Sequence, residues 1–149
     1  MKNLLTQTSV DEILSRIDTL KPSSQALWGE MTVDQMLAHC SAALKMATGD
    51  TALPRPLIGK LIGGFLKSMY SNDKPFGKNS PTDKSVKITD ARNFEEEKQK
   101  LKTAVLAFHS GGEGKITRHP HPFFGKLSPS EWSTGMYKHL DHHLRQFGA

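Results

Sequence analysis

Four helix-start signals, each followed by apolar residues at helical spacing, constrain the fold of this chain more than any other feature of its sequence. In each signal a short polar side chain that can cap a helix stands just before the first turn, and glutamine or acidic residues lie within that turn. The caps are Ser9, Thr32, Asp90 or Asn93, and Ser128. The helices predicted from them span residues 10–20, 33–48, 94–109 and 129–147.

These helices predict an all-α protein, an up-down four-helix bundle of antiparallel neighbours with a long connection between its second and third helices. A chain of 149 residues can bury a substantial core, so residues 1–149 are expected to form a single domain. The long connection, residues 50–90, is rich in Pro, Gly and Lys, and a short amphipathic helix is predicted at 57–70. Because large exposed apolar patches are rare, we expect this connection to pack over one end or side of the bundle.

The histidines of the last predicted helix can be placed by their angle around the helix axis, at about 100° per residue. His139 and His143 then lie about 40° apart, at one edge of an apolar arc that includes Trp132 and Leu140. Both imidazoles are therefore predicted to face inward. The opposite, charged side of the helix carries Lys138, Asp141, His142 and Arg145. We expect that side, His142 included, to face solvent or a partner chain.

The second predicted helix repeats the pattern, because His39 lies at the edge of an apolar arc that includes Met36 and Ala43. Two helices that bury such arcs can meet along them, which would bring His39, His139 and His143 to one point. Buried imidazoles need partners for both ring nitrogens, and a metal ion on one nitrogen with a hydrogen bond on the other supplies them. Three histidine ligands leave a position open for water or substrate, as in catalytic metal sites.

The alternative interpretation is that these imidazoles are hydrogen-bonded core residues without a metal, since an HxxxH pair can arise by chance in a chain with 7 histidines. If a divalent metal is bound, imidazole ligands suit zinc, nickel, iron and copper alike. We expect zinc or nickel, with iron as a third option. Cys40 lies about 100° from His39 and is predicted to be a small core residue. His121, in HPHPFFGKL, either lines the site as a catalytic proton shuttle or belongs to a rigid loop set by its flanking prolines.

The charge pattern and the apolar runs exclude several classes of partner. The formal net charge is +5, but the basic residues between Arg55 and Lys102 are spread singly and are not interleaved with aromatic residues. This pattern predicts a solvated basic surface and no nucleic-acid site. No apolar run approaches the roughly 20 residues of a membrane-spanning helix, so no membrane partner is expected. The single Cys and the short apolar stretch at the N-terminus favour a cytoplasmic location.

Three segments of the chain resemble the DinB/YfiT-like metalloenzyme superfamily: WGEMTVDQMLAHC, HPFFGKLSPSEW and YKHLDHHLRQFG. The resemblance extends from about Glu12 to Gly148 and is closest to a branch catalogued only as a domain of unknown function. The last segment is the most specific, because HxxHH followed by an Arg-Gln pair recurs near the C-terminus of that superfamily. The resemblance implies an up-down four-helix bundle with one metal-binding histidine on the second helix and an HxxxH pair on the fourth. His39, His139 and His143 match that pattern.

The resemblance also implies metal-dependent chemistry, either transfer of a low-molecular-weight thiol to an electrophile or hydrolysis by metal-bound water. The main hypothesis is therefore an S-transferase-like or hydrolase-like enzyme that acts on a small electrophilic substrate. The alternative is a non-catalytic helical-bundle protein of binding or stress response, with an empty or vestigial metal site. Pairing into a homodimer through an exposed helix face is compatible with either hypothesis.

Overall fold

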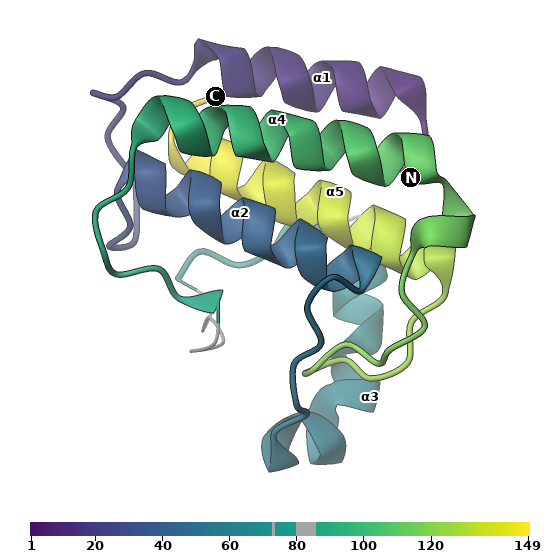
Figure 1. Cartoon of the computed structure of the whole chain (residues 1–149). Helices are drawn as coiled ribbons and strands as arrows, with labels where there is room; N and C mark the ends of the chain where they lie inside the picture. Colours follow the sequence, from purple (N-terminus) through teal and green to yellow (C-terminus); the bar gives the residue numbers. More distant parts are fainter. Residues whose placement is uncertain (73, 80–85) are drawn as a thin grey trace.

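The computed structural model describes residues 1–72, 74–79 and 86–149, and the regular elements in this part of the chain are all helical (Figure 1). The prediction of an all-α protein is thereby confirmed. The helices are α1 (Gln7–Thr19), α2 (Val33–Thr48), α3 (Leu57–Ser71), α4 (Phe94–Gly111), the short 3-10 helix η2 (Glu113–Lys115) and α5 (Pro129–Gln146). None of the described helices is long and apolar enough to cross a membrane.

Three of the four helices that were predicted from start signals begin at the predicted caps. In α2 the Thr32 backbone N–H donates to Gln35 Oε1 at 3.1 Å. In α5 the Ser128 N–H donates to Glu131 Oε2 at 2.7 Å, and Ser128 Oγ accepts from the Glu131 N–H at 3.2 Å. Asn93, one of the two proposed caps, is the residue that caps α4. Because these interactions are local, the sequence alone places the helix starts.

The start of α1 differs from the prediction. The helix begins at Gln7 with Thr6 as its N-cap, so Ser9 is not the cap and lies buried inside the first turn. Leu4 is fully buried, and its backbone N–H lies 3.4 Å from Ser133 O on α5. The chain is therefore already anchored to the core before Ser9, which allows the helix to begin three residues earlier than predicted.

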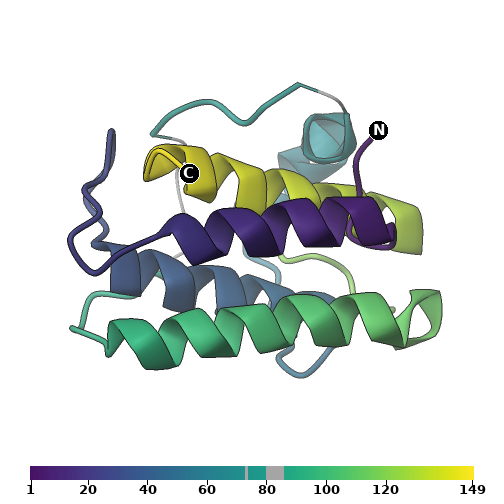
Figure 2. The ribbon, with the colours of Figure 1, turned by 90° about the horizontal axis from the view of Figure 1, so that it is seen from above.

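Four of the helices, α1, α2, α4 and α5, lie side by side (Figures 1 and 2). Helices α2 and α1 each pack against both α4 and α5. This arrangement is consistent with a four-helix bundle. The innermost side chains are Ile13, Ile17, Met36, Leu37, Leu44, Leu101, Val105, Phe108, Trp132, Met136, Leu140 and Leu144.

The relative direction of α2 and α4 corrects the predicted alternating up-down order. The Arg92 N–H, just before α4, donates to Asp34 Oδ2 at the start of α2 at 2.8 Å. At the other end, the Thr117 N–H donates to Ala47 O at 2.9 Å. The two helices therefore run parallel, as their colours in Figure 1 also show. The connection that contains α3 is long enough to return the chain along the whole of α2, whereas a short turn would have forced antiparallel neighbours.

Helix α3 confirms the predicted short helix in the middle segment and packs against α5 (Figure 1). Tyr70, near its end, is 3% exposed. Lys138 of α5 donates from Nζ to Met69 O at 2.6 Å and to Asn72 Oδ1 at 3.0 Å. The described part of the 50–90 connection thus covers a side of α5 that was expected to face solvent, while positions 73 and 80–85 lie outside the described residues.

Asp141 gives a second correction on the charged side of α5. Its side chain was expected in solvent, but the residue is 8% exposed. Its Oδ1 accepts hydrogen bonds from Arg16 Nη1 at 2.8 Å and from Arg145 Nε at 3.1 Å. The reason is the packing of α1 along this side of α5, which the angle around a single helix does not reveal.

Candidate metal centre

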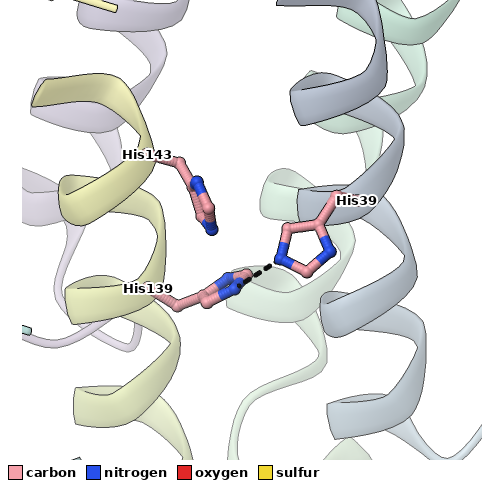
Figure 3. A group of neighbouring side chains, drawn as sticks. All are labelled: His39, His139 and His143. Carbon is pink, nitrogen blue, oxygen red and sulfur yellow. Dashed lines mark hydrogen bonds between the residues drawn. The ribbon is translucent and has the colours of Figure 1, made fainter. Parts of the chain in front are cut away.

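Three histidines from two helices gather at one place in the core, and we call them the histidine cluster (Figure 3). His39 comes from α2, and His139 and His143 lie one turn apart on α5. The Nε2 atoms of His39 and His139 are 3.0 Å apart. The potential ligand atoms of all three residues lie within 4.8 Å of one another. The predicted convergence is therefore present, and three such side chains could hold a metal ion.

The helices place the histidine cluster through their inner faces. His39 is 3% exposed and His143 is 6% exposed, so both rings are removed from bulk water. Neighbouring inner positions of α5, Met136 and Leu140, are core residues. Helices α2 and α5 pack against each other, which sets His39 level with the pair on α5. The angular argument from the sequence thus identified the correct faces of both helices.

Two of the imidazoles are oriented by carbonyl oxygens. His39 Nδ1 lies 2.9 Å from Val86 O, and His143 Nδ1 lies 2.9 Å from Gln146 Oε1. Gln146 Nε2 donates to Trp28 O at 2.6 Å, which turns the amide oxygen toward His143. Because carbonyl oxygens only accept, both Nδ1 atoms carry the proton and both Nε2 lone pairs are left for a ligand. Such outer hydrogen bonds are the usual partners of metal-binding imidazoles.

These orienting residues were not predicted from the sequence. Gln146 lies three residues after His143, a spacing that puts two side chains on the same helix face, so this partner could have been found. Val86 and Trp28 belong to connections without helical periodicity. Their contribution comes from backbone carbonyls, which carry no sequence signal at all.

His139 completes the set with a different arrangement. Its Nδ1 atom is buried and has no hydrogen-bond partner among the described residues. Its Nε2 atom faces His39 Nε2, whose own proton is on the opposite nitrogen. Without a metal the His139 proton would have to lie on Nε2 to bridge this pair. With a metal on the Nε2 atoms the proton would lie on Nδ1, which needs a partner in either case. The donor set therefore fits a divalent ion, which would take the facing Nε2 lone pairs.

Burial keeps the histidine cluster neutral. It lowers the pKa of His143 from the ordinary 6.5 to about 3, with a smaller effect from nearby His39. Burial also sets the pKa of His139 well below 6.5, and the proximity of His143 and His39 adds to this shift. The pKa of His39 is lowered by burial, although its hydrogen bond to Val86 O opposes the change. Near neutral pH the three side chains are thus in the form that binds metals.

His142 does not join the histidine cluster, as predicted, but it does not face open solvent either. Its ring centroid lies 5.6 Å from that of Trp28 and 6.1 Å from that of Phe76, with edge-on geometry in both contacts. Burial lowers its pKa. The chain following α3 passes over this side of α5, so His142 is half-buried and only part of its surface faces solvent.

His121 lies in a tight loop beside the histidine cluster. The loop is closed by two backbone hydrogen bonds between His121 and Gly125, of 2.8 and 3.0 Å. His121 Nδ1 accepts from the backbone N–H groups of Phe123 at 3.1 Å and Phe124 at 3.3 Å. The ring is close enough to lower the pKa of His139, yet it is not one of the three converging histidines. The rigid loop is observed, and a catalytic role for His121 stays a prediction.

Cys40 is buried with its Sγ 3.7 Å from Met36 Sδ. Burial strongly raises the pKa of its thiol, so it stays protonated. The prediction that Cys40 is a core residue is confirmed, and it is absent from the converging set.

In a comparison with family models, the whole chain, residues 1–149, matches the family described as "Protein of unknown function (DUF1569)". Comparison with curated proteins and with solved structures gives no match. The matched description agrees with the expected domain of unknown function and attaches no activity to it. What the site does must therefore be argued from the residues of this chain.

Proposed function

The chain belongs to the family described as "Protein of unknown function (DUF1569)", and we propose that within it this protein holds a divalent metal ion with His39, His139 and His143. One observation carries the proposal: three neutral imidazoles converge, two of them buried and the third half-buried, and the two buried ones are oriented by carbonyl oxygens on the nitrogen away from the shared point. Among the metals that imidazole ligands suit, we expect zinc or nickel, with iron as a third option.

The chemistry that this site would support follows from its ligand number. Three protein ligands leave one position for water or a substrate atom. When bound, the metal would lower the pKa of a coordinated water or thiol and so supply a nucleophile at neutral pH. The protein's own part is to exclude bulk water through burial of the histidines and to fix their tautomers through Val86 O and Gln146 Oε1.

We infer from this arrangement a metal-dependent enzyme that acts on a small electrophile, either as an S-transferase with a low-molecular-weight thiol or as a hydrolase. The resemblance of three segments to DinB/YfiT-like metalloenzymes supports the proposal, as does the side-by-side packing of four helices expected for a DinB-like bundle. A cytoplasmic location is part of the proposal and rests on the single Cys residue.

The test is metal analysis of the full-length protein, purified without an affinity tag that binds metal and dialysed against equimolar zinc and nickel. We expect about one ion per chain, and His39→Ala should lose it. His119→Ala is the matched control, because His119 is an exposed histidine outside the cluster. Equal metal content in wild type and His39→Ala would reject the site.

Loaded protein is then assayed for the two activities with model substrates, nitrophenyl acetate for hydrolysis and chlorodinitrobenzene with glutathione or cysteine for thiol transfer. A rate that disappears in His39→Ala and persists in His119→Ala supports the enzyme. Full metal occupancy with no metal-dependent turnover would instead favour the non-catalytic alternative.

A further inference from the structure

A second group of polar atoms, two on α5 and one on α3, is buried without hydrogen-bond partners among the described residues. Tyr70 Oη, Trp132 Nε1 and His139 Nδ1 are inaccessible to solvent and lack a hydrogen bond within the described part of the chain. Buried polar atoms in folded proteins almost always have a partner, so several orphans in one place need an explanation. We call Tyr70, Trp132 and the Nδ1 side of His139 the donor subsite.

The geometry of α5 places these groups next to one another. Trp132, Gly135 and His139 fall within about 60° of one another around the helix axis, so they form one stripe. The Tyr70 ring lies directly on Gly135, where even a Cβ atom would overlap the ring carbons, including the one that bears the hydroxyl. The Tyr70 ring is thereby held against the stripe at Gly135, next to the Trp132 ring.

Aromatic rings enclose this stripe. The Tyr70 and Trp132 rings meet at right angles with centroids 6.3 Å apart, and the His121 ring lies 5.2 Å from each of them. The Phe124 ring lies 4.6 Å from that of Tyr70. A hydrogen bond made to a ligand in such apolar surroundings is strong, because water does not compete for it.

The three polar atoms of the donor subsite need the same kind of hydrogen-bond partner. An indole N–H can only donate, and a phenol hydroxyl donates readily. His139 Nδ1 also donates once Nε2 binds a metal, because the neutral ring then carries its proton on Nδ1. A molecule that satisfies them must therefore present acceptor oxygens.

The charge of the metal site narrows the class of ligand further. A divalent ion held by three neutral imidazoles leaves its own charge uncompensated. The acidic residues on α5 are engaged elsewhere, since Glu131 pairs with Lys67 at 2.9 Å and Asp141 pairs with Arg16 at 2.8 Å. An anionic group on the ligand would supply both the missing charge and the missing acceptors.

We propose that the ligand of this protein carries a carboxylate whose oxygens accept hydrogen bonds from Tyr70 Oη and Trp132 Nε1, beside the His139 ligand of the metal. The proposal rests on the proposed metal site and names its substrate class, a small carboxylic acid with an apolar body that fits among aromatic rings. In this proposal Tyr70 and Trp132 bind and orient the carboxylate, and the rest of the molecule extends past His139 toward the metal.

The test uses full-length, zinc-loaded, isotope-labelled protein with benzoate as the probe and benzamide as its uncharged counterpart. The protein has 2 tryptophans, so its indole N–H resonances are assigned with Trp28→Phe. Benzoate should shift the Trp132 indole resonance downfield and saturably, and benzamide should bind at least about tenfold more weakly. Tyr70→Phe should weaken benzoate about tenfold. Tyr137→Phe is the matched control, because the Tyr137 hydroxyl donates to Glu12 at 2.9 Å, away from the stripe.

Zinc content is measured on every sample, which separates the two proposals. A wild-type protein that takes up no zinc would overturn the metal site and the subsite that depends on it. Zinc uptake with an unmoved Trp132 resonance, or with equal benzoate affinity in Tyr70→Phe and Tyr137→Phe, would overturn the subsite alone. Equal binding of benzamide and benzoate would overturn the claim that the ligand carries a carboxylate. Cross-relaxation of the Trp132 N–H with buried water at saturating benzoate would show that water is the missing partner and would overturn the subsite.

Discussion

The histidine cluster and the donor subsite share one side of α5 but differ in how their polar atoms are satisfied. In the histidine cluster, carbonyl oxygens accept hydrogen bonds from Nδ1 of His39 and His143, and the inner nitrogens face one another. In the donor subsite, Tyr70 and Trp132 have no partner in the described residues. The outer hydrogen bonds of His39 and His143 fix a geometry that suits a resident ion, whereas donors without partners suit a ligand that binds reversibly.

The largest expected effect is the pH dependence of the stability of the metal-free protein, and it comes from the histidine cluster. Because burial lowers the folded-state pKa of His143 to about 3, the unfolded chain takes up a proton near pH 6.5 before the folded chain does. This contribution to the free energy of unfolding should therefore be fully present above pH 6.5. It should be lost as the pH falls below 6.5, by about 1.4 kcal/mol per pH unit for each such histidine. His139, whose pKa is also well below 6.5, should add to the slope.

Urea unfolding at a series of pH values between neutral and mildly acidic would measure this slope. His143→Leu should flatten it, and His119→Ala should leave it as in wild type. A slope unchanged by His143→Leu would contradict the assignment to the cluster. With metal present, release should accompany the same fall in pH, since protons and metal compete for the same nitrogens.

An intermediate effect is expected from Gln146, which orients His143 through a hydrogen bond at Nδ1. Gln146→Leu removes the acceptor for His143 Nδ1 and keeps the side chain about the same size. Loss of such an outer hydrogen bond typically weakens metal binding by about 10- to 100-fold. Competition with a chromophoric chelator would measure the change, with Gln35→Leu, at the distant start of α2, as a control. Unchanged metal affinity would show that the Gln146 amide does not fix the orientation of the His143 imidazole.

The same contrast explains how much could be predicted from the sequence. The histidine cluster was found because helix caps and the angle around a helix are local properties, and His39, His139 and His143 all lie on capped helices. Val86 lies in a part of the long connection between α2 and α4 that has no periodicity. Tyr70 ends the predicted helix of that connection, but the spacing within this helix does not indicate which other helix it meets. The donor subsite was therefore out of reach, although Trp132 and His139 on the stripe were both singled out.

The errors have the same origin. Asp141 and His142 were placed in solvent because the angle around α5 describes one helix and not its neighbours. The packing of α1 and the passage of the chain after α3 bury that side. The parallel course of α2 and α4 was missed for a related reason, because a long connection permits either direction.

The smallest expected effect sharpens the comparison most directly, and it concerns stability without any ligand. In the free protein the Tyr70 hydroxyl is buried and unpartnered in the described structure, so Tyr70→Phe removes a desolvated polar group and no hydrogen bond. The free energy of unfolding should stay within about 0.5 kcal/mol of wild type or rise. Tyr137→Phe makes the same chemical change on a tyrosine whose hydroxyl donates to Glu12, and it should cost about 1 kcal/mol. Parallel urea unfolding of the two variants measures the difference. A larger loss in Tyr70→Phe than in Tyr137→Phe would mean that the Tyr70 hydroxyl already has a partner in the free protein, and the donor subsite would then be as complete as the histidine cluster.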